Sequence, residues 1–326
     1  MSAGVSMQSG KFTNFARVVV VFNLAVILWG AFVRATGSGA GCGSHWPLCN
    51  GQVLPRAPQV ETLIELAHRL TSGVAFLLVL AMLVWALRLF PKGHPARLGA
   101  VLSTVFIITE ALVGAGLVLF EWTGVDQSVG RVISMGVHLI NTFLLLAALV
   151  MTVHWGGGGE PVHFRGHGAG RWLFGLAFLL MLLLGVSGAV TALGDTLFPA
   201  GSLAEGIAQD FEATAHFLVR LRVWHPLIAV LVGLYVTFLA GLLVLFRANP
   251  AIRRLCGLLF GLFVAQLLAG VVNLLLLAPV WMQLVHLLLA DLVWITLVQL
   301  ALYNFAVSEV AQVPAPGAEP PVVAAS

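Results

Sequence analysis

The chain has 326 residues, of which 60% are hydrophobic and 9% charged, and its mean hydropathy is +1.02. These values exclude an ordinary soluble protein, in which about 45–50% of residues are apolar and about 25% are charged. The formal net charge of +3 is too small to indicate nucleic-acid binding, and three cysteines exclude a disulfide-built scaffold. The composition therefore indicates a polytopic membrane protein in a lipid bilayer.

Eight apolar runs are long enough to cross a bilayer, which takes about 20 apolar residues per helix. In chain order they are 18–36, 65–90, 97–120, 131–154, 171–192, 222–247, 252–277 and 280–306. All should be helices, because hydrocarbon offers backbone amides no other partners. If the N-terminus is cytoplasmic, ten of the 16 basic residues face inward and the long loops 37–64 and 193–221 face outward. We therefore predict a multi-pass membrane protein with both termini cytoplasmic.

The second half of the chain resembles the first at a spacing of roughly 150 residues. The matched segments are Gly30–Gly37 with Gly185–Ala192, Glu110–Gly114 with Gln266–Gly270, His68 with His225, and Met135–Leu139 with Met282–Leu287. Each unit holds four spans, so both units insert the same way up. The sequence thus predicts an all-α integral membrane protein with eight transmembrane helices in two parallel four-helix-bundle repeats. The predicted divisions are an N-terminal tail (1–17), two halves (18–154 and 171–306), a cytoplasmic linker (155–170) and a disordered tail (307–326).

Four histidines, in spans two, four, six and eight, indicate a function, because ionisable groups inside a membrane are costly and usually functional. They are His68, His138, His225 and His286, and each lies within the first two turns or so of its span. Two histidines on neighbouring helices of a bundle can ligate a haem iron axially. We therefore predict one haem site in each half. Zinc or copper is the alternative, although no third protein ligand is evident at that depth in the second half.

Glu65 lies three residues before His68, so both side chains share a helix face. It is either a proton acceptor beside an apolar haem cleft or an interfacial carboxylate at a helix start, and the spacing alone favours the second interpretation. Arg222 occupies the matching position before His225. The two sites are therefore not chemically equivalent, which suggests that one half reacts while the other transfers electrons.

Cys42 and Cys49 lie in the first outer loop. An oxidising outer space allows a disulfide there, and Pro47 with the neighbouring glycines would help to close so short a ring. Exposed disulfides can also exchange with thiols, so a structural and a redox role both remain open.

Several motifs together resemble the haem A synthase family of the bacterial, cysteine-containing type, over residues 15–306. They are Arg34-Ala35-Thr36-Gly37-Ser38-Gly39, the Cys42 and Cys49 pair around Trp46-Pro47-Leu48, Asn50-Gly51, Glu65-Leu66-Ala67-His68-Arg69 and His225-Pro226. The resemblance implies an oxidoreductase that converts the C8 methyl group of haem O into a formyl group by successive hydroxylations.

The resemblance also implies roles for individual residues. His68 and His138 would hold the substrate haem, His225 and His286 would ligate the iron of a haem b cofactor, Glu65 would be catalytic, and Cys42 and Cys49 would form a disulfide. Implied partners are haem O, haem O synthase, cytochrome oxidase assembly factors and an electron acceptor such as a quinone, while the oligomeric state stays open. The chain departs from the family in two places: residues 193–221 lack a second cysteine pair, and Gly43-Ser44-His45 replaces the usual Pro-Asp type segment.

Two other classes compete with this interpretation. An electron-transfer cytochrome that binds two haems b and oxidises quinol would use the same histidine pairs, but it needs neither Glu65 nor the cysteine loop. A transporter with parallel repeats would need polar groups near the bilayer midplane, where Glu110 and Asp291 are the candidates. We predict that both of these carboxyl groups serve in packing or hydrogen bonding.

Overall fold

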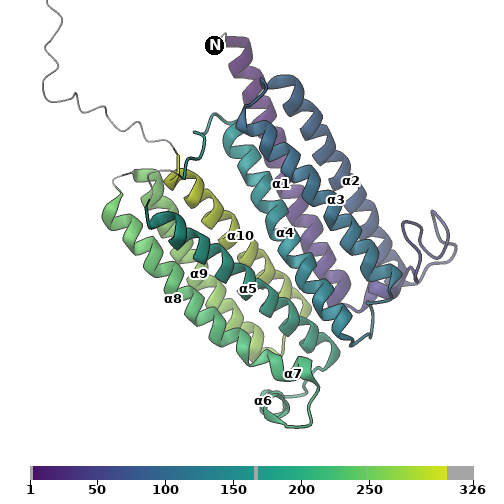
Figure 1. Cartoon of the computed structure of the whole chain (residues 1–326). Coiled ribbons are helices and arrows are strands. Elements are labelled where there is room, and N and C mark those ends of the chain that lie inside the picture. Colours follow the sequence, from purple (N-terminus) through teal and green to yellow (C-terminus); the bar gives the residue numbers. More distant parts are fainter. Residues whose placement is uncertain (1–2, 165–167, 248, 307–326) are drawn as a thin grey trace, which may run out of the picture.

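A computed structural model describes the chain apart from residues 1–2, 165–167, 248 and 307–326 (Figure 1). Within the described part, eight helices are long and apolar enough to cross a membrane. The eight predicted spans and the multi-pass membrane assignment are confirmed. The predicted disordered tail at 307–326 lies outside the described residues.

The long helices pack as two groups of four that lie side by side (Figure 1). The first group contains α1 (Ala3–Ala35), α2 (Val60–Leu89), α3 (Pro95–Leu119) and α4 (Val129–Gly156). The second contains α5 (Gly170–Leu197), α8 (Trp224–Phe246), α9 (Pro250–Leu275) and α10 (Val280–Asn304). Three short helices lie in the connections: η1 (Ser38–Ala40), α6 (Leu203–Phe211) and α7 (Phe217–Arg222). The repeat relation between the two groups stays a prediction.

Local sequence signals account for several helix starts. Proline occupies the first position of α3 and α9, where its missing N–H costs nothing, and the preceding His94 and Asn249 side chains cap the backbone. Ser128 caps α4 by accepting a hydrogen bond from the Arg131 amide. The helices therefore begin close to the predicted boundaries.

The first helix begins well before the predicted boundary at residue 18. It is continuous from Ala3, so the described part of the predicted N-terminal tail is helical. Phe12 and Ala16 are fully buried against neighbouring helices of the first group. Hydropathy marks where the chain becomes uniformly apolar, whereas packing of these two residues extends the helix beyond that point.

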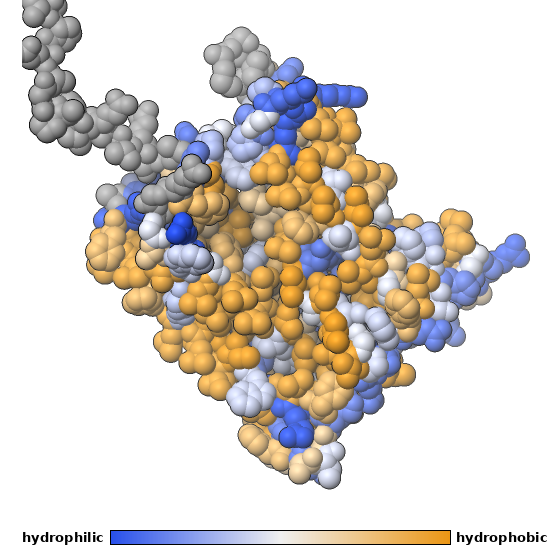
Figure 2. Space-filling view, viewed as in Figure 1, coloured by the Kyte–Doolittle hydropathy of each residue, from blue (hydrophilic) through white to orange (hydrophobic). Residues whose placement is uncertain are grey.

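The two groups meet where α4 packs against α5 and α10, and α1 adds contacts to the same two helices. The Phe143 and Trp294 rings stack with centroids 4.8 Å apart, and the Trp294 indole N–H donates a 2.7 Å hydrogen bond to the Phe143 carbonyl. Figure 2 shows apolar side chains over the flanks of the helices and hydrophilic ones at their ends. This distribution suits a protein whose flanks face lipid and whose ends face water.

Candidate functional site

The four predicted histidines lie at one end of the helices, which also holds the loop between α1 and α2 and which we call the loop end. The spans that carry them begin at Val60, Val129, Phe217 and Val280, and the histidines follow these starts by eight, nine, eight and six residues. At 1.5 Å per residue, these offsets place the four imidazoles at roughly 9–14 Å from the helix starts. The predicted common depth is therefore present.

The second group brings two of these imidazoles together. The ring centroids of His225 on α8 and His286 on α10 lie 6.3 Å apart, with their planes at 81°. Metal–imidazole bonds are about 2 Å long, so two imidazoles on opposite faces of one metal have centroids roughly 6 Å apart. The pair therefore has the spacing of two axial ligands of one iron.

Glycines on adjacent helices make room for three of the four imidazoles. A Cβ atom at Gly30 or Gly188 would lie 3.0 Å from Cε1 of His68 or His225, respectively. A Cβ atom at Gly270 would lie 3.2 Å from Cε1 of His286. The repeat alignment matched Gly30 with Gly185, but the glycine that contacts the second-half imidazole is one turn further on, at Gly188. The sequence does not show which of two glycines three residues apart contacts the imidazole.

Buried ring nitrogens without protein partners also fit a bound group. Nδ1 of His68, His138 and His286 is buried in each case and has no hydrogen-bond partner, although Glu110 lies within ion-pair distance of His138. Native proteins satisfy most buried polar atoms, so such orphans need an explanation. Ser187 Oγ lies 2.9 Å from His225 Nδ1, which leaves Nε2 of that ring free to ligate. The spacing of His225 and His286 therefore fits axial ligation of a haem in the second half, and the free Nδ1 of His68 fits a bound group in the first.

A zinc or copper site would need at least one more protein ligand beside a histidine pair. Within the described ranges, no three His, Cys, Asp or Glu side chains are grouped so as to hold a metal ion. Structural zinc sites use four protein ligands and catalytic ones use three.

The first-half site is covered by a disulfide-closed loop. Cys42 and Cys49 form a disulfide, and both residues are buried. The Cys42 amide donates a 2.8 Å hydrogen bond to Oε2 of Glu65, a side chain that is itself buried. The loop therefore contacts the carboxylate that precedes His68 by one helical turn.

Arg69 joins the same carboxylate to the far side of this loop. Its Nε and Nη2 atoms donate to Oε1 of Glu65 at 3.1 and 2.5 Å. Its Nη1 atom donates to the carbonyl oxygens of His45 and Leu48, both at 2.6 Å. We call Glu65, Arg69 and the loop 42–49 the loop clamp. In the sequence Arg69 belongs to a family motif but has no evident role, because nothing in the spacing shows which loop atoms it reaches.

Among the described residues of the second half, none forms an equivalent of this clamp. Arg222, at the position that matches Glu65, forms ion pairs with Asp195 at 3.2 Å and Asp210 at 2.8 Å. These acidic residues come from α5 and α6, so the guanidinium is directed into the connection above the helices. The predicted chemical difference between the two sites is present.

Arg34 is a second arginine whose contacts the sequence does not reveal. Its guanidinium donates to Ala192 O and Thr196 Oγ1 on α5, both at 2.7 Å, and to Gln283 Oε1 on α10 at 2.8 Å. In the sequence, the only indication that Arg34 has a specific role is its charge in the last turn of an apolar helix. Arg34 ties the two groups together at the loop end.

Glu110 and Asp291, the two midplane candidates, have different environments. Glu110 accepts hydrogen bonds from Asn141 and Thr142 on α4, and its Oε1 lies 3.4 Å from His138 Nδ1. The predicted hydrogen-bonding role of Glu110 is confirmed. Asp291 is fully buried, and neither of its carboxyl oxygens has a hydrogen-bond partner.

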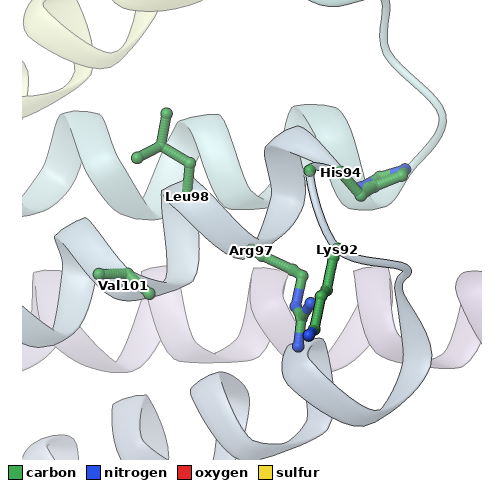
Figure 3. A pocket seen from close by; sticks show the side chains of 6 residues that line it. Lys92, His94, Arg97, Leu98 and Val101 are labelled. Atoms are coloured by element: carbon green, nitrogen blue, oxygen red, sulfur yellow. The ribbon is translucent and has the colours of Figure 1, made fainter.

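A surface pocket lies at the opposite end of the bundle, in the turn between α2 and α3 (Figure 3). It has a volume of about 400 Å³ and is lined by Lys92, Gly93, His94, Arg97, Leu98 and Val101. α2 continues for 21 residues beyond His68 to Leu89, or roughly 32 Å of helix, and Lys92 follows in the turn. This pocket is therefore separate from the histidine sites.

A sequence profile of the cytochrome oxidase assembly protein family, COX15-CtaA, matches residues 13–298. The chain belongs to this family. The matched segment contains all four histidines, Glu65 and the cysteine pair.

Three relatives of this COX15-CtaA protein show different coverage. "Heme A synthase" of Exiguobacterium sp. (strain ATCC BAA-1283 / AT1b) is 28% identical over 80% of this chain and 81% of its own length. "Heme A synthase" of Geobacillus kaustophilus (strain HTA426) is 39% identical over 43% of each chain. "Protoheme IX farnesyltransferase" of Thermus thermophilus (strain ATCC 27634 / DSM 579) is 57% identical over 82% of this chain. The matched part is 44% of that relative, so the chain spans less than half of its length.

Proposed function

We propose that the protein is a haem A synthase, an oxidoreductase that converts the C8 methyl group of haem O into a formyl group. One observation carries the proposal: a buried carboxylate, held by a disulfide-closed loop, precedes one histidine pair and has no counterpart beside the other. An electron-transfer cytochrome has no need of this asymmetry. Membership of the COX15-CtaA family and the relatives named heme A synthase support the same activity.

The two histidine pairs have separate roles in this proposal. His225 and His286 ligate the iron of a haem b cofactor, and their 6.3 Å centroid separation supports this assignment. His68 and His138 hold the substrate haem in the first half. Haem b, when bound, supplies one-electron redox chemistry, while the protein positions and tunes it.

Glu65 is the catalytic proton acceptor in this proposal. When water supplies the oxygen atom, conversion of a methyl to a formyl group releases four electrons and four protons, so it needs both an electron acceptor and a base. A carboxylate has about four acceptor positions, and the donors from Cys42 and Arg69 occupy three of them. One position remains for a proton, and the loop clamp fixes where it points.

The relative from Thermus thermophilus bears on the supply of substrate. Its name is that of a protohaem farnesyltransferase, and the part that matches this chain makes up 44% of its length. We propose that a prenyl transfer to protohaem supplies haem O, and that haem O synthase and cytochrome oxidase assembly factors are partners.

The proposed location is the plasma membrane, with successive hydroxylation near its outer face. The eight apolar helices support a multi-pass arrangement. The proposal places both termini in the cytoplasm and the loop end outside, where an oxidising space maintains the Cys42–Cys49 disulfide.

Haem extraction tests the proposal. The full chain is expressed with a haem O synthase in a host that makes no haem A, and extracted haems are separated by chromatography. Wild type should produce haem A; Glu65→Gln should retain bound haem but form at least tenfold less product, since a general base contributes about 10²–10⁴-fold. His225→Ala should lose the tightly bound haem b.

Glu61→Gln is the matched control, because Glu61 is an exposed carboxylate in the first turn of the same helix. It should leave product formation unchanged. Wild-type protein with two bound haems but no haem A would overturn the proposal and favour the quinol-oxidising cytochrome. Full haem b content in His225→Ala would overturn the division of roles between the halves.

A further inference from the structure

The two histidine pairs differ in the side chain that faces one imidazole from the neighbouring helix. Oε1 of Glu110 on α3 lies 3.4 Å from Nδ1 of His138 on α4. In the second group, Nε2 of Gln266 on α9 lies 3.1 Å from Nε2 of His286 on α10. The two positions match in the repeat alignment. An ionisable carboxyl group in one half thus corresponds to a neutral amide in the other.

Other contacts hold Glu110 against His138. Asn141 Nδ2 and Thr142 Oγ1 each donate a hydrogen bond of 2.5 Å, one to each carboxyl oxygen. Asn141 is itself held, since it accepts from Thr109 at 2.6 Å and donates to Phe106 O at 2.9 Å. These donors lie one turn beyond His138 on the same helix. The carboxyl group is therefore oriented before any ligand binds.

Gln266 has no such support. Its Oε1 atom is buried and has no hydrogen-bond partner. Its contact to His286 positions that imidazole without adding a charge. His138 therefore has a charged neighbour that is fixed by hydrogen bonds, whereas His286 has a neutral neighbour that is weakly held.

This difference has a direct consequence for a metal bound by these imidazoles. A carboxylate beside the free ring nitrogen of a ligating histidine fixes the tautomer and raises the basicity of the ligand. A more basic ligand stabilises the oxidised metal more than the reduced one. The charge counts strongly here because the helix interior screens it less than water does.

We infer that Glu110 is a positioning residue that lowers the reduction potential of the first-half iron, and that the Glu110 and Gln266 pair sets this potential below that of the second-half iron. The inference rests on the proposed assignment of one haem to each half. Electrons that leave a substrate in the first half then move toward the second half, which agrees with a redox cofactor there. The competing explanation is that Glu110 only ties α3 to α4, in which case its charge has no effect on the iron.

Spectroelectrochemical titration of the full chain separates these explanations. The protein is purified in detergent and loaded with iron protoporphyrin IX, and all titrations are made at one fixed pH. A His225→Ala background removes the second-half site, and a His68→Ala background removes the first-half site. Each site is thereby titrated alone, by its optical bands and by the ferric low-spin electron paramagnetic resonance signal.

Opposite shifts are expected for the two exchanges. Glu110→Gln in the His225→Ala background should raise the midpoint potential, with about a tenfold change in the ferric-to-ferrous ratio, or about 59 mV for one electron. Gln266→Glu in the His68→Ala background should lower it. Glu121→Gln, which changes the net charge equally at an exposed residue after α3, should shift neither.

An unchanged or lower potential in Glu110→Gln, with the six-coordinate spectrum retained, overturns the inference. If the Glu110→Gln variant no longer binds haem, the titration of Gln266→Glu decides alone. An unchanged or raised midpoint potential in Gln266→Glu then overturns the inference. Failure of the proposed function is a different result, namely that wild type forms no haem A. The two failures are therefore distinguishable.

Discussion

Glu65 shows how a single buried carboxylate acquires its orientation. Its two oxygens accept from the Cys42 amide and from Arg69, and Arg69 also reaches two carbonyl groups of the disulfide-closed loop. Hydrogen bonds to charged groups are each worth about 1.5–3 kcal/mol, and partial exposure reduces that value. The catalytic assignment of Glu65 therefore depends on a neighbour four residues along the same helix.

Substitution of Arg69 tests this dependence. Arg69→Leu should leave Glu65 with the Cys42 amide alone, release the loop carbonyls of His45 and Leu48, and destabilise the loop by roughly 1–3 kcal/mol. Product formation should fall, and limited proteolysis of the loop should accelerate. Arg56→Leu, at an exposed arginine in the same connection, is the control. Equal proteolysis rates and equal product yields in the two variants would refute the role of Arg69 in the loop clamp.

At the scale of helices, the imidazoles need close approach of neighbouring backbones. α5 passes so near α8 that a Cβ atom at Gly188 would lie 3.0 Å from His225. Small residues at such positions let helices pack closely in membranes. The position of the imidazole therefore depends on both residues, the histidine on one helix and the glycine on the next.

Gly188→Leu should displace the His225 ring. Overpacking costs about 1–3 kcal/mol, which corresponds to roughly a 5–150-fold loss of haem affinity if the strain falls on the ligand. Gly175→Leu, on the same helix with open space around it, should retain haem, since loss of a helical glycine also favours the helix. The measurement is haem content after dialysis against apomyoglobin. Equal retention in both variants would show that Gly188 does not define the site.

For the whole molecule, hydropathy and helix geometry predicted the spans and the common depth of the histidines. Both follow from local properties, because about 20 apolar residues and a 1.5 Å rise apply to any helix. The contacts of Arg34 and Arg69 could not be predicted, since each joins segments whose relative placement depends on packing. The contact of Gly188 with His225 and the extension of the first helix from residue 18 back to Ala3 could not be predicted for the same reason: composition does not identify the face that packs.

The distribution of charge and the position of the disulfide predict the orientation of the protein in the bilayer. The loop end carries the disulfide and the acidic residues Glu61, Asp195 and Asp210, whereas the opposite end carries Lys11, Arg17, Arg88 and Lys92. Basic residues favour the cytoplasmic side, and disulfides persist in oxidising compartments, so both features place the loop end outside.

Reporter fusions test this orientation. Alkaline phosphatase, which is active only outside the cytoplasm, should be active when inserted at Ser202 in the connection between α5 and α6 and inactive at the C-terminus. Green fluorescent protein at the same two places should show the reverse pattern, which controls for expression. Active phosphatase at the C-terminus would invert the arrangement and place the Cys42–Cys49 pair in the reducing cytoplasm. A disulfide there would not persist, so that result would also remove the loop clamp from the proposed mechanism.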